Sequence, residues 1–88
     1  MVHDMDTITN IVIGQHLRRL RKRAGLSQYE VAHRCQFSQS YVSKIELGER
    51  TLLFSEMFLY AEALGLSCDE LLFSTRHALF DHLRNLRY

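Results

Sequence analysis

The sequence predicts an all-α fold in a single domain, and three observations support this. Proline is absent, and two capping boxes, each a serine followed three residues later by a glutamate, begin at Ser27 and Ser67. Three of the four glycines stand where helical patterns end, a place that suits glycine because it adopts positive φ without steric penalty. They are Gly25, Gly48 and Gly65. An 88-residue chain builds one small core, so we expect one domain and a partner subunit.

The N-terminal part is expected to form a polar arm over residues 1–7, followed by a first helix from about residue 7 to residue 24. Arg21 stands one turn after Leu17, near the side of this helix that would be buried. A buried guanidinium needs a partner, and we expect Glu46 to supply it.

The next two helices are predicted over residues 28–35 and 39–47. The first opens with the capping box at Ser27, and Val31, Ala32 and Cys35 recur at a spacing that buries one face. Ser38 is the second cap, after a tight turn at residues 36–37. Two short helices joined in this way predict a helix-turn-helix motif.

The second helix of this motif has two different sides. The apolar side holds Phe37, Tyr41, Val42 and Ile45. The polar side holds Gln39, Ser40, Ser43 and Lys44. Short hydroxyl, amide and amine groups pair with base edges in the major groove, so this side is the candidate base-reading surface.

The remaining helices are expected over residues 53–64 and from the capping box Ser67-x-x-Glu70 onward. Residues 8–73 would form the DNA-binding domain and residues 74–88 a C-terminal helical extension. The extension has an apolar stripe that packs on its own domain or forms a dimer interface, and either a sixth helix or a continuation of the fifth fits the pattern. The stripe consists of Leu79, Phe80, Leu83 and Leu86.

Charge is unevenly distributed along the chain, although the net charge is only +1. Residues 16–50 hold eight Lys or Arg against three Glu, a local net charge of +5. Residues 51–75 hold four acidic residues and no basic one. A basic segment beside a polar reading surface predicts contacts with DNA phosphates.

Other site classes find little support in the sequence. Cys35 and Cys68 are far apart and outside any C-x-x-C pattern, so we expect free thiols. The five histidines show no metal-ligand spacing and are expected at the surface, with His16 or His33 near a phosphate. No nucleophile signature, phosphate loop, signal peptide or membrane span is recognisable, and we expect a cytoplasmic protein without catalysis, metal or cofactor.

The chain resembles the lambda-repressor-like, or Xre, family of helix-turn-helix regulators over residues 13–72. The resemblance rests on IGQHLRRLRKRAGLSQYEVAHRCQFSQSYVSKIELGER and the later YAEALGLSCDELL. It implies a compact five-helix DNA-binding domain that acts as a dimer on a pseudo-palindromic operator. It also implies that Gln28 contacts a phosphate and braces the recognition helix, and that Arg21 and Glu46 form the internal ion pair.

The same resemblance implies that the polar side of the recognition helix faces bases or adjacent phosphates. The full set of predicted DNA contacts is Gln28, Ser38, Gln39, Ser40, Tyr41, Ser43, Lys44 and Arg50.

Two departures from the family pattern carry structural expectations. Gln36 replaces the usual turn glycine and would need a left-handed or distorted conformation, at a cost of about 1 kcal/mol. Leu52, Leu53 and Phe54 replace polar residues after Arg50, so this loop would serve the core or a dimer interface.

These observations predict a dimeric, sequence-specific transcription regulator of double-stranded DNA, either a repressor or an autoregulator. Antitoxins and restriction-modification controllers belong to the same class. The alternative is a protein-interaction adaptor that keeps the helix-turn-helix scaffold and binds a protein partner through residues 52–54 and the C-terminal stripe.

Overall fold

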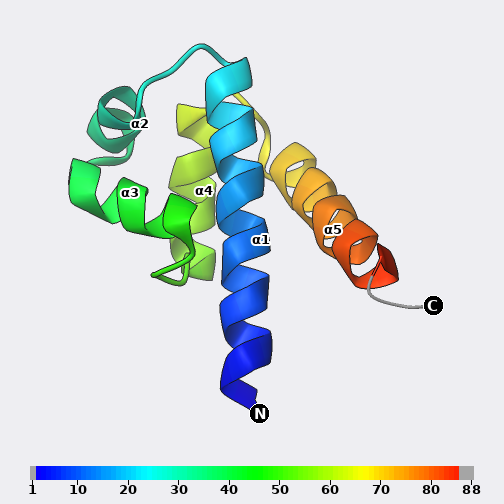
Figure 1. The fold of residues 1–88 in the computed structure, drawn as a ribbon. Coiled ribbons are helices and arrows are strands. Elements are labelled where there is room, and N and C mark those ends of the chain that lie inside the picture. Colours follow the sequence, from blue (N-terminus) through cyan, green and yellow to red (C-terminus); the bar gives the residue numbers. More distant parts are fainter. Residues whose placement is uncertain (1, 86–88) are drawn as a thin grey trace.

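A computed structural model describes residues 2–85, which form five helices and no strand (Figure 1). The helices are α1 (Val2–Arg23), α2 (Gln28–Cys35), α3 (Gln39–Leu47), α4 (Phe54–Ala63) and α5 (Cys68–Asn85). The predicted all-α, five-helix fold is therefore confirmed.

The expected N-terminal arm at residues 1–7 is wrong for the part of it that the structure describes, because α1 already begins at Val2. The segment contains Asp4 and Asp6 and no proline or glycine. Acidic residues near the N-terminus of a helix stabilise it, because that end of the helix dipole is positive, and no residue in the segment breaks a helix. The helix therefore begins at Val2 instead of near residue 7.

The helix-turn-helix forms where its capping signals place it. The Glu30 N–H donates to the Ser27 hydroxyl over 3.0 Å, and the Ser27 N–H donates to the Glu30 carboxylate over 2.8 Å. Ser38 caps α3 by accepting from the Tyr41 N–H at 3.1 Å. Gln36, between the two helices, has φ 60° and ψ 36°, which is the left-handed conformation expected for this position.

The C-terminal segment continues the fifth helix rather than starting a sixth. α5 runs from Cys68 to Asn85 without a break at the expected boundary between residues 73 and 74. Leu86, one of the four residues of the apolar stripe, lies outside the described residues.

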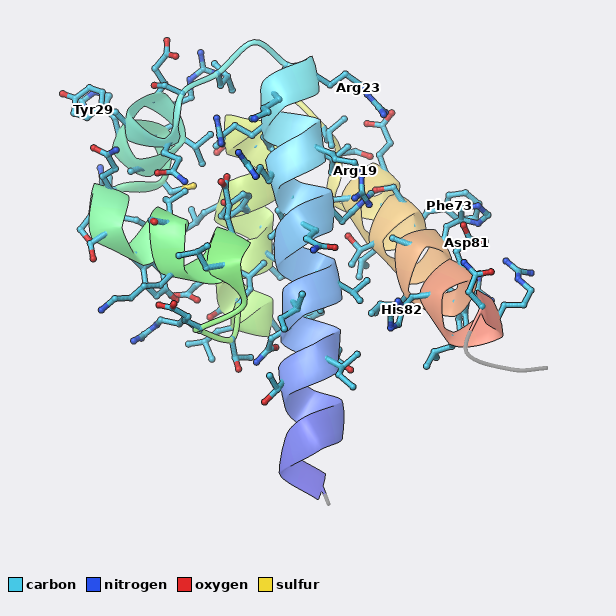
Figure 2. The ribbon with its side chains drawn as sticks, viewed as in Figure 1. Arg19, Arg23, Tyr29, Phe73, Asp81 and His82 are labelled. Atoms are coloured by element: carbon cyan, nitrogen blue, oxygen red, sulfur yellow. The ribbon has the colours of Figure 1, made fainter. Side chains whose placement is uncertain are left out.

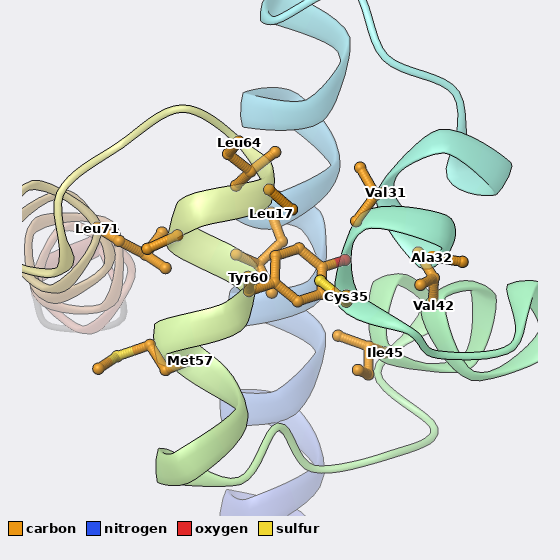
Figure 3. Close-up of a cluster of buried hydrophobic side chains, with 12 residues drawn as sticks. Leu17, Val31, Ala32, Cys35, Val42, Ile45, Met57, Tyr60, Leu64 and Leu71 are labelled. Atoms are coloured by element: carbon orange, nitrogen blue, oxygen red, sulfur yellow. The ribbon is translucent and has the colours of Figure 1, made fainter.

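The core lies between α1 and α4, with α2 and α3 on one side and α5 on the other (Figure 1). Tyr60 lies at its centre, fully buried between residues of all the other helices (Figure 3). The other large, fully buried side chains are Leu17, Val31, Val42, Ile45 and Leu71. α3 is thus held on the side of the molecule opposite α5.

Candidate nucleic-acid interface

α3 presents the polar side chains that the sequence singles out. Gln39, Ser40 and Lys44 are exposed and Ser43 is half-buried, while Val42, Ile45 and Glu46 face the interior. The four polar side chains form no hydrogen bond with another of the side chains that the structure describes, those of residues 7–85. Their donors and acceptors are therefore free to meet an external partner.

A buried ion pair holds α3 against α1. Arg21 donates to both carboxylate oxygens of Glu46, through Nε over 2.6 Å and through Nη2 over 3.0 Å. A third bond runs from Arg21 Nη1 to the Leu26 carbonyl over 2.9 Å. The hydrogen bonds from Arg21 to Glu46 are the main reason that the pKa of Arg21 is raised, so the guanidinium stays charged.

Gln28 joins the same network from the first turn of α2. Its Nε2 donates to Glu46 Oε1 over 2.9 Å, so one carboxylate connects α1, α2 and α3. This contact matches the bracing role that the resemblance implies for Gln28. The second amide N–H of Gln28 is left for another acceptor.

Gly14 is a positioning residue that the sequence did not reveal. A Cβ at this position would collide with the Ile45 carbonyl oxygen and would lie 2.6 Å from the Glu46 carbonyl oxygen. The absence of a side chain therefore lets the backbones of α1 and α3 come together. Gly14 is the one glycine that ends no helical pattern, and this was the only sequence signal.

Tyr41, in the first turn of α3, is in contact with Arg50, which follows the helix in the chain. The Tyr41 hydroxyl donates to Glu56 Oε1, and the ring packs edge-on against Phe37 at 4.9 Å between centroids. The Arg50 guanidinium lies over the Tyr41 ring, 4.5 Å from its centroid. Tyr41 is thus engaged on both sides and half-buried, and Arg50 is the exposed cation of the pair.

His16 does not lie at the surface as expected, because it faces α5 and is 9% exposed. Its Nε2 lies 2.9 Å from the Ser74 hydroxyl, which joins α1 to α5. Burial is the main reason that the pKa of His16 is lowered, with Arg19 and Arg23 adding to the effect. The histidine spacing gave no sign of this contact, because it depends on how two distant helices pack.

The side of the molecule away from α3 carries a largely apolar groove between α1 and α5, which we call the apolar end. Ile8 and Val12 of α1 and Leu79, Phe80 and Leu83 of α5 line a groove of about 270 Å³. Phe80 is 52% exposed and Leu83 41% exposed, so α5 leaves a large part of its stripe uncovered.

The loop before α4 divides between the core and the surface. Leu52 packs against the core, as expected for one of the two roles considered for this loop, whereas Leu53 and Phe54 remain exposed. Phe54 packs edge-on against Phe58, with 5.3 Å between the ring centroids.

Cys35 and Cys68 are free thiols, and burial raises the pKa of the Cys35 thiol to about 11. No group of His, Cys, Asp or Glu in residues 2–85 is arranged to hold a metal ion. Within the same residues, no helix combines the length and the apolar character needed to cross a membrane.

Sequence comparison finds two matches that agree with this architecture. A helix-turn-helix family model matches residues 17–71. The HTH-type transcriptional regulator y4dJ of Sinorhizobium fredii is 39% identical over 69 residues, which are 78% of this chain and 90% of that protein.

Solved structures give the same picture. The restriction-modification controller protein C.AhdI from Aeromonas hydrophila superposes with a TM-score of 0.65 at 36% identity, over 69% of this chain and 92% of that one. The restriction-modification controller C.Esp1396I, solved as a tetramer with its natural 35 base-pair operator, shares the fold with a TM-score of 0.74 at 18% identity, over 82% of this chain and 95% of that one.

Proposed function

The chain belongs to the helix-turn-helix family of transcriptional regulators, and from this premise we propose that it is a repressor or autoregulator that binds a pseudo-palindromic operator as a dimer. One observation carries the proposal: α3 exposes polar side chains that form no hydrogen bond with another side chain of residues 7–85, and α3 is itself fixed by a buried network. Such a surface is preorganised for an external polar partner, and the +5 charge of residues 16–50 favours DNA.

Binding would combine two kinds of contact. Gln39, Ser40, Ser43 and Lys44 would face base edges or adjacent phosphates, and each well-formed bidentate contact to a base contributes about 1–3 kcal/mol of discrimination. Gln28, Ser38 and the Arg50 that stacks on Tyr41 would contact the backbone and fix the orientation of α3. Occupancy of the operator near a promoter would then regulate transcription in the cytoplasm, where bacterial DNA lies.

The dimer is proposed on the apolar end of the molecule. Leu79, Phe80 and Leu83 lie there beside Ile8 and Val12, and a two-fold interface in this region would leave both α3 helices exposed. Half-sites about 34 Å apart would then place both recognition helices on one side of the duplex.

Oligomeric state tests this interface. Phe80→Asp puts a charge on an exposed position and should convert the dimer into a folded monomer in sedimentation. Tyr29→Asp is the matched control, because Tyr29 is a similarly exposed aromatic on α2 and its loss should leave the dimer intact. A Phe80→Asp protein that remains dimeric would remove this helix from the interface.

The proposal includes two narrower roles, restriction-modification controller and antitoxin. C.AhdI, 36% identical to the chain, is a restriction-modification controller, which supports the first of these roles.

The proposed function is tested by selecting duplexes from a random DNA pool at physiological salt. The wild-type protein should enrich a defined motif, and the Gln39→Ala/Lys44→Ala variant should lose the enrichment while it stays folded. No enrichment by the wild type would contradict sequence-specific binding.

The alternative function is a protein-interaction adaptor, and the exposed Phe54–Phe58 pair favours it. An adaptor should retain its protein partner in the Gln39→Ala/Lys44→Ala variant and lose it in Phe54→Ser. If the chain is the proposed regulator, its DNA binding should be lost in the Gln39→Ala/Lys44→Ala variant and kept in Phe54→Ser.

A further inference from the structure

The basic side chains in the second half of α1 lie on different sides of the helix. Arg19 and Arg23 lie on the side of α5, away from α2 and α3 (Figure 2). Arg18, in contrast, lines a hollow of about 350 Å³ together with residues of α2 and α3. The basic residues of this helix therefore face different surroundings, and only Arg18 and Arg21 among them line this hollow.

Polar side chains from three helices line the hollow, beside the apolar Ile11 and Leu47. Gln15 and Arg18 come from α1, Gln28 from α2 and Ser43 from α3, and the buried Arg21–Glu46 pair forms the inner wall. A second hollow of about 290 Å³ adjoins it and shares Gln15 and Arg18.

The chemistry of these walls suits an anion. Arg21 binds both oxygens of Glu46, so the negative charge of the inner wall is compensated. The Arg18 guanidinium has no carboxylate partner among the described side chains of residues 7–85. The Ser43 hydroxyl and the second amide N–H of Gln28 add donors, and phosphate oxygens are acceptors only.

The hollow also borders the candidate base-reading surface. Ser43 and Leu47, which line it, lie four and eight residues after Gln39 and so share one stripe of α3. DNA whose bases face this stripe brings its backbone next to α1.

We propose that the hollow receives one backbone phosphate beside each half-site and that Arg18 binds this phosphate. The inference rests on the proposed function and adds a contact on α1 to those on α2 and α3. Arg18 anchors the flank of each half-site without reading its sequence, because a phosphate carries no base information.

The test compares Arg18→Ala with Arg23→Ala on the selected operator. Both residues are exposed, and each variant removes one positive charge from the same helix. The slope of log K against log salt should shrink by about 0.9 per lost phosphate contact, or about 1.8 for a dimer, in Arg18→Ala only. The preferred motif should be unchanged in both variants, and thermal denaturation verifies that both are folded.

Equal slopes in the two variants would overturn the inference, because long-range charge would then explain the effect. Inorganic phosphate, added at matched ionic strength, distinguishes a DNA backbone phosphate from a free phosphate ion as the ligand of the hollow. Displacement of DNA by phosphate that disappears in Arg18→Ala supports the proposal, because the two anions then compete for the hollow, whereas phosphate that binds through Arg18 without weakening DNA binding would assign the hollow to a free anion. A slope that falls only in Arg18→Ala, with no motif enriched by the wild type, would keep this inference and reject sequence-specific regulation.

Discussion

Two halves of the molecule differ in the groups that they leave exposed. We call residues 16–50 the polar half and residues 51–85 the apolar half. In the polar half, a buried charged pair and Gln28 are bonded to one another, and the uncommitted groups are on the outside. In the apolar half, Phe54, Phe73 and Phe80 are each more than half exposed. Net charge separates the halves as well, with +5 over residues 16–50 and −3 over residues 51–85.

This difference indicates which surface is complete in a single chain and which surface needs a partner to cover it. The polar half uses its internal hydrogen bonds to fix α3, so its candidate base-reading surface is ordered before any partner binds. The apolar half leaves hydrophobic groups in water, where burial of a large apolar side chain would contribute about 1.5–3 kcal/mol. A second subunit is therefore expected at the apolar half and DNA at the polar half.

The largest effect should come from breaking the network of the polar half. Glu46→Ala leaves Arg21 buried without its carboxylate partner and should lower the free energy of unfolding by about 3–5 kcal/mol. Chemical denaturation measures this change. Glu49→Ala, an exposed glutamate three residues later, should stay within about 0.5 kcal/mol of the wild type, and equal losses would argue against the network.

Gly14→Ala tests the close approach of α1 and α3. In an open helix this change would stabilise by about 1 kcal/mol, because alanine is the better helix former. Here the added Cβ meets the α3 backbone, and we expect a loss of about 1–3 kcal/mol. The sign of the change in unfolding free energy is therefore the readout, with Gln15→Ala as the exposed neighbour, and a gain in stability would refute the contact.

Gln36→Gly should have a smaller effect in the opposite direction. Glycine removes the penalty of the left-handed conformation, and the gain should be about 1 kcal/mol or less once the added freedom of the unfolded chain is included. Thermal denaturation of Gln36→Gly and Gln36→Ala shows whether the turn is strained, because alanine keeps the cost of the left-handed conformation and glycine removes it. Similar melting temperatures for the two variants would mean that the turn is not strained.

The smallest effect concerns the contact between the halves and has a pH dependence. Because the pKa of His16 is lowered in the folded protein, the unfolded chain binds the proton more readily, and stability should fall as the pH drops below about 6.5. His16→Gln should flatten this decline in denaturation experiments from pH 7 to pH 5. An unchanged decline would assign it to other groups.

How much of the structure the sequence predicts depends on how far along the chain each interaction acts. The bounds of α2 and α3 follow from Ser27, Ser38 and Gly48, because capping acts within one helical turn. The positions of Gly14 and His16 depend on which helices pack together, and no local pattern encodes that. The left-handed Gln36 was expected only through the family resemblance.

The division of tasks between the halves is tested most directly by selecting bound duplexes with the wild type and Phe80→Asp in parallel. The account predicts a two-fold-symmetric motif with fixed spacing for the wild type and a single half-site for the variant, because the reading surface survives when the dimer is lost. The same symmetric motif from both proteins, or no motif from the folded variant, would contradict the separation of DNA reading from dimer formation.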